Sequence, residues 1–334
     1  MKVLVTDYAW PSLDIERELL AEVGAEIIEA KTGEEDELVE LAPPCDAILT
    51  CWKRVTPAVL DAAPRCRVVG RYGVGLDNIA VDHATELGIV VTNVPDFCVD
   101  EVSDHALALM LAHVRRVVAF SRQTRAGEWD NVGAGRIHRL SGQTLGLVGC
   151  GRIGGATGTK ALALGMNVLA HTRSGRNLPD GIEPVATLDE LLERSDVVSL
   201  HLPLTPETEG LIGDEQLRRM KPSAFLINTS RGAIVDQAAL TRAVADGQIG
   251  GAGLDVLAPE PADPADPLLH LDTAIVTPHA SFYSEESTVD LQQRAAACVA
   301  TVLRGELPDN VVNRDVLEHP RLRMNELPAE ASEA

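Results

Sequence analysis

The sequence of 334 residues has few basic side chains and no hydrophobic run long enough to cross a membrane. Lys and Arg together number 29, against 50 Asp and Glu, which gives a formal net charge of -21. Nucleic acids and anionic membranes are bound through basic surfaces, so neither is expected as a partner. An anionic substrate would have to be held by local cations or by backbone N–H groups.

The sequence also lacks a Cys-x-x-Cys pair and any His/Cys cluster with the spacing of a zinc site, so no metal site is expected. Its six cysteines stand at positions 45, 51, 66, 98, 150 and 298. Cys150 lies in a glycine-rich turn, where a disulfide would obstruct a ligand. Free thiols in a reducing cytoplasm are therefore expected. The start of the chain, at 1–7, is typical of a strand rather than of a signal peptide.

Short apolar runs alternate with helical segments along most of the chain, which predicts α/β domains with parallel sheets covered by helices. Helices are predicted at 13–23, at 99–122 with Asp100 as N-cap, from the glycine turn to about Leu164, and at 285–304. The helix at 99–122 is apolar nearly all round, as expected where two domains meet. Strands are predicted at 3–6, 47–50, 68–69, 90–92, 145–148, 167–171, 197–200, 224–228, 253–256 and 275–276.

The most informative motif is a Gly-x-Gly-x-x-Gly turn near the middle of the chain, between a predicted strand and a predicted helix. Gly149 allows the tight turn, Gly151 lets the backbone approach a pyrophosphate, and Gly154 lets helix and strand pack closely. Arg152 and Ile153 begin the helix, whose N-terminus stabilises the phosphates. Such a turn can also occur without a ligand, but the residues after the later strands favour a dinucleotide site.

The second strand of this unit ends without the carboxylate that usually binds the adenosine ribose. Thr172, Arg173 and Ser174 follow it instead, with Arg176 nearby. An acid would repel a 2′-phosphate, whereas a guanidinium and two hydroxyls can bind one. This favours NADP(H) over NAD(H). The alternative is that Arg173 is a solvated loop residue of an enzyme that accepts either cofactor.

Three residues of complementary chemistry follow later strands, where ligands bind in doubly wound sheets: Arg231, Glu260 and His279. Arg231 can hold the carboxylate of a 2-oxo acid and polarise its ketone. His279 can donate a proton to the new hydroxyl, and Glu260 can orient the imidazole and favour its protonated form. Each alone could be an ordinary loop or turn residue. Together, behind a cofactor turn, they predict hydride transfer to a 2-oxo acid.

These motifs closely resemble the D-isomer-specific 2-hydroxyacid dehydrogenase family. The resemblance covers about residues 40–313 and rests on the segments 73–79, 148–154, 195–205, 220–232, 254–261 and 277–279. It implies reversible NAD(P)H-dependent reduction of a 2-oxo acid to a D-2-hydroxy acid, with Arg231, Glu260 and His279 as the catalytic set. It also implies a homodimer, built largely by the cofactor domain and the helix at 99–122.

The resemblance assigns further residues to the site. Asp255 would face the nicotinamide amide, and the backbone around Val74 and Gly75 would receive the substrate carboxylate. The cofactor groove would be lined by His201, Pro203, Thr208, Thr229 and Ser230.

One turn departs from the family pattern, because the segment 49–54 aligns with a cleft-lining turn that is usually small and polar. Trp52 and Lys53 stand there instead. Lys53 could bind a second acidic group of the substrate. Equally, Lys53 could be a solvated loop lysine while Trp52 packs the turn.

Two other functions stay open. One is a redox-sensing NAD(H)-binding protein similar to the transcriptional co-repressors called C-terminal-binding proteins, which keep the same triad. The other is phosphoglycerate dehydrogenase, for which the missing ribose acid and the turn with Trp52 and Lys53 are unfavourable. No regulatory domain is expected after residue 313.

The expected architecture is two doubly wound parallel-sheet domains. A Rossmann cofactor domain at 101–284 is inserted into a flavodoxin-like substrate domain formed by 1–100 and 285–317. The active site is expected in the cleft between them, with hinge closure during catalysis. Residues 318–334, rich in Pro, Glu and Ala, are expected to be disordered.

Overall fold

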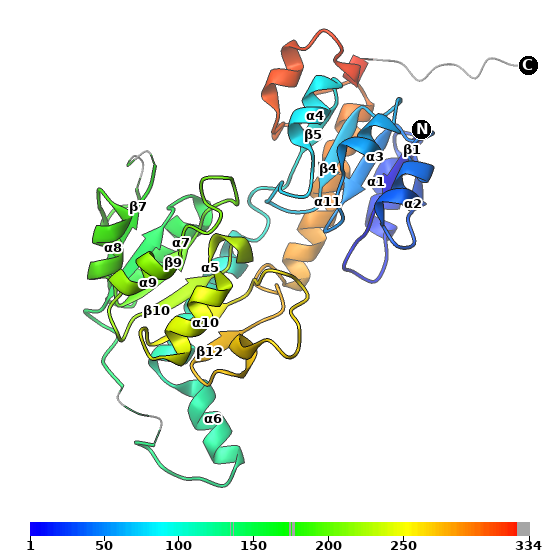
Figure 1. Ribbon diagram of the computed structural model, residues 1–334. Helices are drawn as coiled ribbons and strands as arrows, with labels where there is room; N and C mark the ends of the chain where they lie inside the picture. The colour runs from blue at the N-terminus through cyan, green and yellow to red at the C-terminus, as the bar shows by residue number, and fades with distance from the viewer. Residues whose placement is uncertain (134, 136, 174, 176–177, 326–334) are drawn as a thin grey trace, which may run out of the picture. The chain divides into compact units, whose positions relative to one another are not determined.

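The computed structural model describes residues 1–133, 135, 137–173, 175 and 178–325. The chain divides into two compact units (Figure 1). Unit 1 combines Met1–Phe97 with Ser284–Ala334, and unit 2 is Cys98–Tyr283. Each unit is built on one parallel sheet with helices, which confirms the predicted fold class.

Unit 1 has, in its described residues, a five-stranded sheet of order β2-β1-β3-β4-β5, the flavodoxin-like order. Its strands are β1 (Lys2–Val5), β2 (Glu26–Glu29), β3 (Ala47–Thr50), β4 (Val68–Arg71) and β5 (Val90–Thr92). Its helices are α1 (Asp14–Ala21), α2 (Glu35–Leu41), α3 (Pro57–Asp61), α4 (Val81–Glu86) and α11 (Glu285–Leu303).

Helices cover both faces of this sheet, and successive residues of a strand pack against opposite helical layers. Ile48 and Val69 lie in the core beneath α2, α3 and α4. Their neighbours Leu49 and Gly70 face α11, where a Cβ on Gly70 would lie 2.8 Å from Leu49 and from Val299. A close helix contact therefore requires glycine there.

The segment after α11 packs back onto unit 1. Val312 N donates to Val91 O at 2.8 Å, and the Asn313 side chain bonds Val91 N, Ile89 O and Thr85 Oγ1. The short 3-10 helices η3 (Arg314–Glu318) and η4 (Arg323–Asn325) follow.

The sequence predicts disorder from 318, but the structure is ordered further. Arg323 N donates to Gly88 O at 2.9 Å, and its guanidinium donates to Ala63 O at 3.1 Å. These bonds to backbone carbonyls explain the difference, because composition does not reveal them. Residues 326–334 lie outside the described part of the chain.

Unit 2 has, within the described residues, a seven-stranded sheet of order β12-β11-β10-β9-β6-β7-β8. When the strands are numbered along the chain from β6, this is the Rossmann order with one further strand, β12, at its edge. Strands are added on one side of β6 up to β8 and on the other side from β9 onward, so the direction of the strand order reverses between β6 and β9. The strands are β6 (Thr144–Val148), β7 (Asn167–His171), β8 (Ile182–Pro184), β9 (Val197–Leu200), β10 (Phe225–Asn228), β11 (Gly251–Leu254) and β12 (Ala274–Val276).

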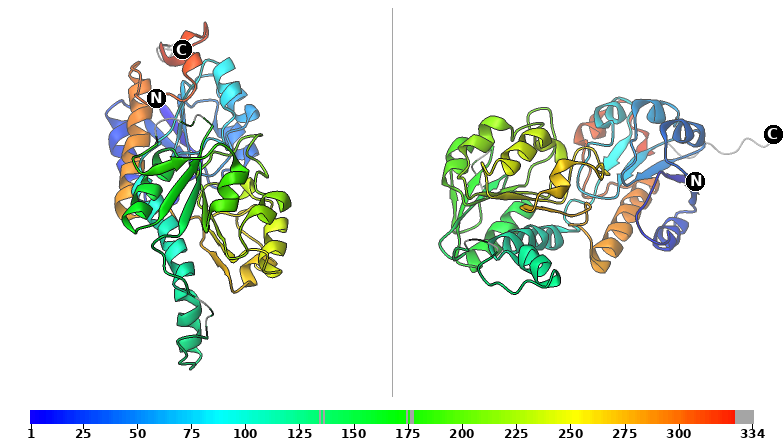
Figure 2. Two further views of the ribbon diagram at one scale, coloured as in Figure 1. Left: turned by 90° about the vertical axis from the view of Figure 1, so that its left-hand side faces the viewer. Right: turned by 60° about the horizontal axis from the view of Figure 1, so that its bottom comes forward.

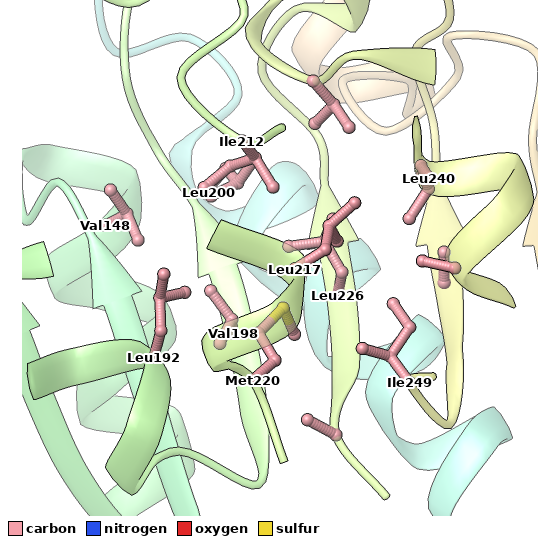
Figure 3. Packing of buried hydrophobic residues seen from close by; sticks show 14 of the residues in the cluster. Val148, Leu192, Val198, Leu200, Ile212, Leu217, Met220, Leu226, Leu240 and Ile249 are labelled. Carbon is pink, nitrogen blue, oxygen red and sulfur yellow. The ribbon is translucent and has the colours of Figure 1, made fainter. Parts of the chain in front are cut away.

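The helices of unit 2 cover both faces of its sheet. Figure 3 shows one face, where Leu192, Leu217 and Leu240 of three helices, and Met220 directly after the second, pack on strand residues such as Val198 and Leu226. These helices are α8 (Leu188–Arg194), α9 (Asp214–Arg219) and α10 (Gln237–Ala245). The opposite face carries α5 (Val99–Val114) and α7 (Arg152–Ala163) over a second apolar cluster. Two 3-10 helices, η1 (Gly232–Ile234) and η2 (Pro267–His270), also belong to this unit.

The single helix predicted at 99–122 is wrong in two respects. The structure has α5 followed by a separate helix, α6 (Val117–Arg125), because Arg116 adopts a left-handed backbone with φ of 53°. Neither Gly nor Pro marks this break in the sequence. Asp100 is not the N-cap, which is Cys98. Asp100 instead accepts from Lys160 Nζ of α7 at 3.1 Å. Figure 2 shows α6 extending away from the sheet of unit 2.

All six cysteines lie in the described part of the chain and are free thiols. Burial raises the pKa of Cys51 and of Cys66 to about 12, so neither is reactive at neutral pH. None of the helices that the structure describes is long and apolar enough to span a bilayer.

The buried His113 of α5 predicts an acid-sensitive stability. Its ring stacks on Phe225 at a centroid distance of 3.9 Å, and burial, with the charge of Arg116, lowers its pKa to about 4. Between pH 6.5 and 4 the unfolded chain binds a proton here that the folded chain does not, so stability falls as pH falls. Between pH 7 and pH 5, the free energy of unfolding of the variant His113→Phe should fall by about 2 kcal/mol less than that of the parent. Urea unfolding at both pH values measures this, and equal losses would contradict it.

Candidate active site

The carboxyl ends of neighbouring strands in unit 2 each contribute one part of the candidate site. In sheet order these parts are His279 after β12, Asp255 after β11, Arg231 after β10, His201 after β9 and the glycine turn after β6. Ligands of doubly wound sheets bind at this edge, beside the reversal of strand order. The topology therefore brings together residues that lie up to 130 positions apart (279 minus 149).

The three glycines of the turn have different surroundings. A Cβ on Gly149 would collide with the backbone oxygen of His201, and Gly149 has a φ of 89°. A Cβ on Gly154 would lie 2.5 Å from the carbonyl oxygen of Gly149. A Cβ on Gly151 would meet no atom within 4 Å. Packing thus requires the first and third glycines, whereas the second faces open space at the start of α7, which fits an approaching pyrophosphate.

The turn after β7 is where an adenosine ribose would lie in this fold. Thr172 Oγ1 accepts from Gly175 N at 2.9 Å and closes the turn. Thr205, through a hydrogen bond, and to a smaller extent the charge of Arg173 lower the pKa of Glu207, which places Arg173 near the loop after β9. No carboxylate stands at Thr172, as the sequence shows. Ser174 and Arg176 lie outside the described residues.

The loop after β9 carries several of the candidate cofactor residues. His201 Nε2 lies 2.9 Å from Ser199 Oγ, and burial lowers the pKa of His201 to about 4, so the ring is neutral at physiological pH. Thr208 Oγ1 donates to Pro203 O at 2.7 Å and braces the loop. Ser230 Oγ donates to Leu200 O at 2.8 Å. Among the described residues, the Thr229 hydroxyl is buried without a hydrogen-bond partner, as expected of a group that a ligand satisfies.

Arg231 is held by a residue that sequence reasoning missed. The buried Asn228 side chain donates to Arg231 O at 2.8 Å and accepts from Ser230 N at 3.0 Å. Arg231 Nη1 also donates to Ser230 O at 2.8 Å. The signal for Asn228 is its place directly before a turn, since asparagine side chains bond the backbone two residues on.

His279 and Glu260 form a close pair. His279 Nδ1 lies 2.7 Å from Glu260 Oε2, and Glu260 Oε1 accepts from Leu257 N at 3.0 Å. The carboxylate is therefore fixed from both sides. It sets the tautomer of the ring, which makes Nε2 the nitrogen that can exchange a proton with a substrate. His279 has a φ of 53°, which is uncommon for a residue other than glycine.

Hydrogen bonds to Asp255 hold the backbone at His279 in this conformation. The buried carboxylate of Asp255 accepts from Thr277 Oγ1 at 2.6 Å, Ala280 N at 2.9 Å and Ser281 N at 2.9 Å, and its carbonyl accepts from His279 N at 2.8 Å. His105 Nε2 lies 2.9 Å from Thr277 Oγ1. Asp255 thus holds the loop that carries His279, a role that sequence reasoning did not assign to it.

The three candidate substrate residues of unit 1 follow β3 and β4. Val74 is exposed, and its carbonyl accepts from Asn93 Nδ2 at 2.8 Å. Gly75 follows it in the same loop. Lys53 Nζ lies 2.7 Å from Glu34 Oε1. Lys53 therefore has an acidic partner within unit 1, which sequence reasoning did not anticipate.

A Rossmann sheet with an open glycine turn and a histidine–carboxylate pair beyond its strands defines a nicotinamide-dependent oxidoreductase. Residues 107–281 match the family described as D-isomer specific 2-hydroxyacid dehydrogenase, NAD binding domain. A glyoxylate reductase of Korarchaeum cryptofilum (strain OPF8) is 43% identical over 288 residues, which cover 84% of this chain and 86% of that protein.

Two further relatives are similar along most of this chain. A D-3-phosphoglycerate dehydrogenase of Methanocaldococcus jannaschii is 39% identical over 328 residues, 96% of this chain and 61% of that longer protein. A structure of the NADPH-dependent glyoxylate/hydroxypyruvate reductase of Sinorhizobium meliloti with NADP and malonate is 30% identical. It matches with a TM-score of 0.84 over 93% of this chain and 97% of that one.

The chain belongs to the D-isomer-specific 2-hydroxyacid dehydrogenase family, which confirms the resemblance seen in the sequence. It is an oxidoreductase that reduces 2-oxo acids to D-2-hydroxy acids with NAD(P)H.

The unequal surroundings of the glycines predict opposite phenotypes. Gly151→Ala should leave the melting temperature unchanged but weaken NADPH binding at least about tenfold, or 1.4 kcal/mol, because the methyl group occupies the open approach to the turn. Gly149→Ala should lower the melting temperature, because alanine is strained at its φ and collides with His201. Calorimetric titration and thermal unfolding separate the two effects. NADPH affinity retained in Gly151→Ala would exclude a pyrophosphate at this turn.

Proposed function

We propose that Arg231, Glu260 and His279 are the catalytic residues of a D-2-hydroxyacid dehydrogenase. The observation that carries the proposal is the 2.7 Å contact between His279 and Glu260 in the same unit as the open glycine turn. Arg231 binds the substrate carboxylate and polarises the ketone. When bound, the reduced nicotinamide supplies the hydride to C2. His279, protonated before the transfer, donates its Nε2 proton to the ketone oxygen and becomes neutral, and Glu260 stabilises the positive charge that the ring carries until that step.

The same proposal assigns the cofactor groove. Gly149, Gly151 and Gly154, with the start of α7 at Arg152 and Ile153, hold the pyrophosphate. The neutral His201 ring, Pro203, Thr208, Thr229 and Ser230 line the groove, and Asp255, besides bracing its loop, lies toward the nicotinamide. Support comes from the open space at Gly151 and from the unpartnered Thr229 hydroxyl.

NADP(H) is the proposed preferred cofactor. Thr172 stands where an acid would repel the 2′-phosphate, and Arg173 follows it with Ser174. A Sinorhizobium relative of 30% identity is named as NADPH-dependent, which supports this preference.

The proposed substrates are small 2-oxo acids such as glyoxylate, the substrate for which several relatives are named. The backbone at Val74 and Gly75 receives the carboxylate, and Lys53 can exchange Glu34 for a second acidic group of the substrate. The KM of Lys53→Ala for dianionic and monoanionic acids tests that last assignment. Turnover of phosphohydroxypyruvate would instead support the phosphoglycerate dehydrogenase alternative, which the Methanocaldococcus relative keeps open.

The proposed assembly is a homodimer in the cytoplasm. Large apolar side chains are exposed on and after α6, with Val117 at 55%, Trp129 at 92% and Val132 at 73%. A second copy that covers them explains why these side chains are tolerated on an otherwise acidic protein. Sedimentation equilibrium measures the oligomeric state.

The catalytic assignment predicts the kinetics of two variants. His279→Ala should lower kcat by about 100-fold to 10,000-fold, because the proton donor is lost, and should leave NADPH affinity within about twofold. Glu260→Gln should lower kcat less, because the amide can still hold the ring but cannot stabilise its charge. Steady-state kinetics with glyoxylate and NADPH titrations measure both. A His279→Ala enzyme with parental kcat would disprove the assignment.

The cofactor assignment predicts a specificity change. Thr172→Asp should raise KM for NADPH at least about tenfold and leave KM for NADH equal or lower, because the new carboxylate repels a 2′-phosphate and can bond the ribose. Thr172→Asn is the matched control of similar size without charge. Identical cofactor kinetics in Thr172→Asp and Thr172→Asn would argue against a 2′-phosphate at this turn.

A further inference from the structure

The turn at 51–53, directly after β3, is built by side chains from elsewhere in unit 1. Three consecutive backbone N–H groups converge on one carboxylate, that of Asp7. The donor–acceptor distances are 3.0 Å from Cys51 N, 2.7 Å from Trp52 N and 3.2 Å from Lys53 N. Such a concave group of N–H donors is an anion site, and here the protein's own carboxylate fills it.

The carbonyl groups of the turn are held in the same way. Asn78 Nδ2 donates to Cys51 O at 3.2 Å and to Lys53 O at 2.9 Å. Thr50 Oγ1 also donates to Lys53 O at 2.8 Å. These contacts come from side chains rather than from a sheet ladder, so the conformation of the turn depends on a few named residues.

The fixed turn presents two side chains in defined directions. Trp52 is 41% exposed, and Arg71 Cζ lies 5.9 Å from its ring centroid. Lys53 Nζ reaches Glu34, and a Cβ on Gly33 would lie 2.6 Å from Lys53 Cγ, so glycine at 33 makes room for the lysine chain. Both side chains therefore depend on the backbone that Asp7 sets.

We propose that Asp7 is a positioning residue for substrate selection, acting through the turn at 51–53. Because its carboxylate occupies the three N–H groups, the turn can offer a substrate only the Trp52 ring and the Lys53 ammonium. Selection among substrates at this turn then depends on the size and charge of the substrate's own side chain. The inference rests on the proposed function, in which this turn belongs to the substrate site.

The experiment replaces Asp7 in the full-length protein. In Asp7→Ala the amides at 51–53 should exchange with deuterium at least about tenfold faster, because their acceptor is gone. KM for a 2-oxo acid with a charged side chain, such as oxaloacetate, should rise at least about tenfold, with kcat within about threefold and NADPH affinity within about twofold of the parent, while KM for glyoxylate, which has no side chain, should change less. Asp7→Asn should be intermediate, because one oxygen remains while its amide group opposes a backbone donor.

Two controls separate positioning from general destabilisation. Asn313→Ala removes three hydrogen bonds from the same unit but none from the turn, and should lower stability without raising KM. Asp36→Ala removes one exposed charge of α2 and should change neither exchange at 51–53 nor KM.

The outcomes are distinct. Faster exchange in Asp7→Ala with an unchanged KM would overturn the inference and leave the proposed function intact, as would an equal rise in KM in Asn313→Ala. Unchanged exchange at 51–53 would overturn it directly. The proposed function would be overturned if the parent enzyme turned over no 2-oxo acid. That result is obtained with the parent enzyme and involves no variant.

Discussion

The candidate site depends on the hydrogen bonds that the buried carboxylate of Asp255 accepts. This carboxylate accepts from Thr277, Ala280 and Ser281, and so fixes a loop that no regular secondary structure supports. That loop holds His279 at a φ of 53° and brings its ring to Glu260. A left-handed residue persists only where its surroundings determine it. His279, the proposed general acid, is thus placed by a network of buried hydrogen bonds, while Glu260 itself sets the tautomer.

The cofactor half of the site depends on a second constraint, the close approach of two strand ends. Gly149 lies against the carbonyl of His201, and Gly154 against that of Gly149, so the ends of β6 and β9 meet with no room for a side chain. Of the three glycines of this turn, Gly151 alone faces open space. One short turn therefore joins the sheet tightly and still leaves its backbone open to a ligand. Carboxyl ends of parallel strands share one edge, so His279 and Arg231 come to the same side.

The parts that the sequence predicts well are those with a local signal. Buried apolar runs located β3, β5, β7 and β9 to the residue, and the glycine spacing located the turn. The edge strands β2 and β8 went unpredicted, because exposed residues interrupt their apolar pattern. The break at Arg116 has no Gly or Pro to mark it. Non-local partners also escaped prediction: Glu34 for Lys53, and Asp7 for a turn 44 to 46 residues away. Such pairs form only once the sheet brings distant loops together.

Following a labelled hydrogen tests the central claim that this site performs hydride transfer to a 2-oxo acid. The enzyme is incubated with NADPH deuterated at C4 and with pyruvate, and the product is analysed by mass spectrometry and chiral chromatography. The account predicts one deuterium at C2 of D-lactate, and at least about 100-fold less labelled product from the variant His279→Ala over the same time. Tight NADPH binding without labelled product from any 2-oxo acid would contradict it and favour a redox-sensing binding protein.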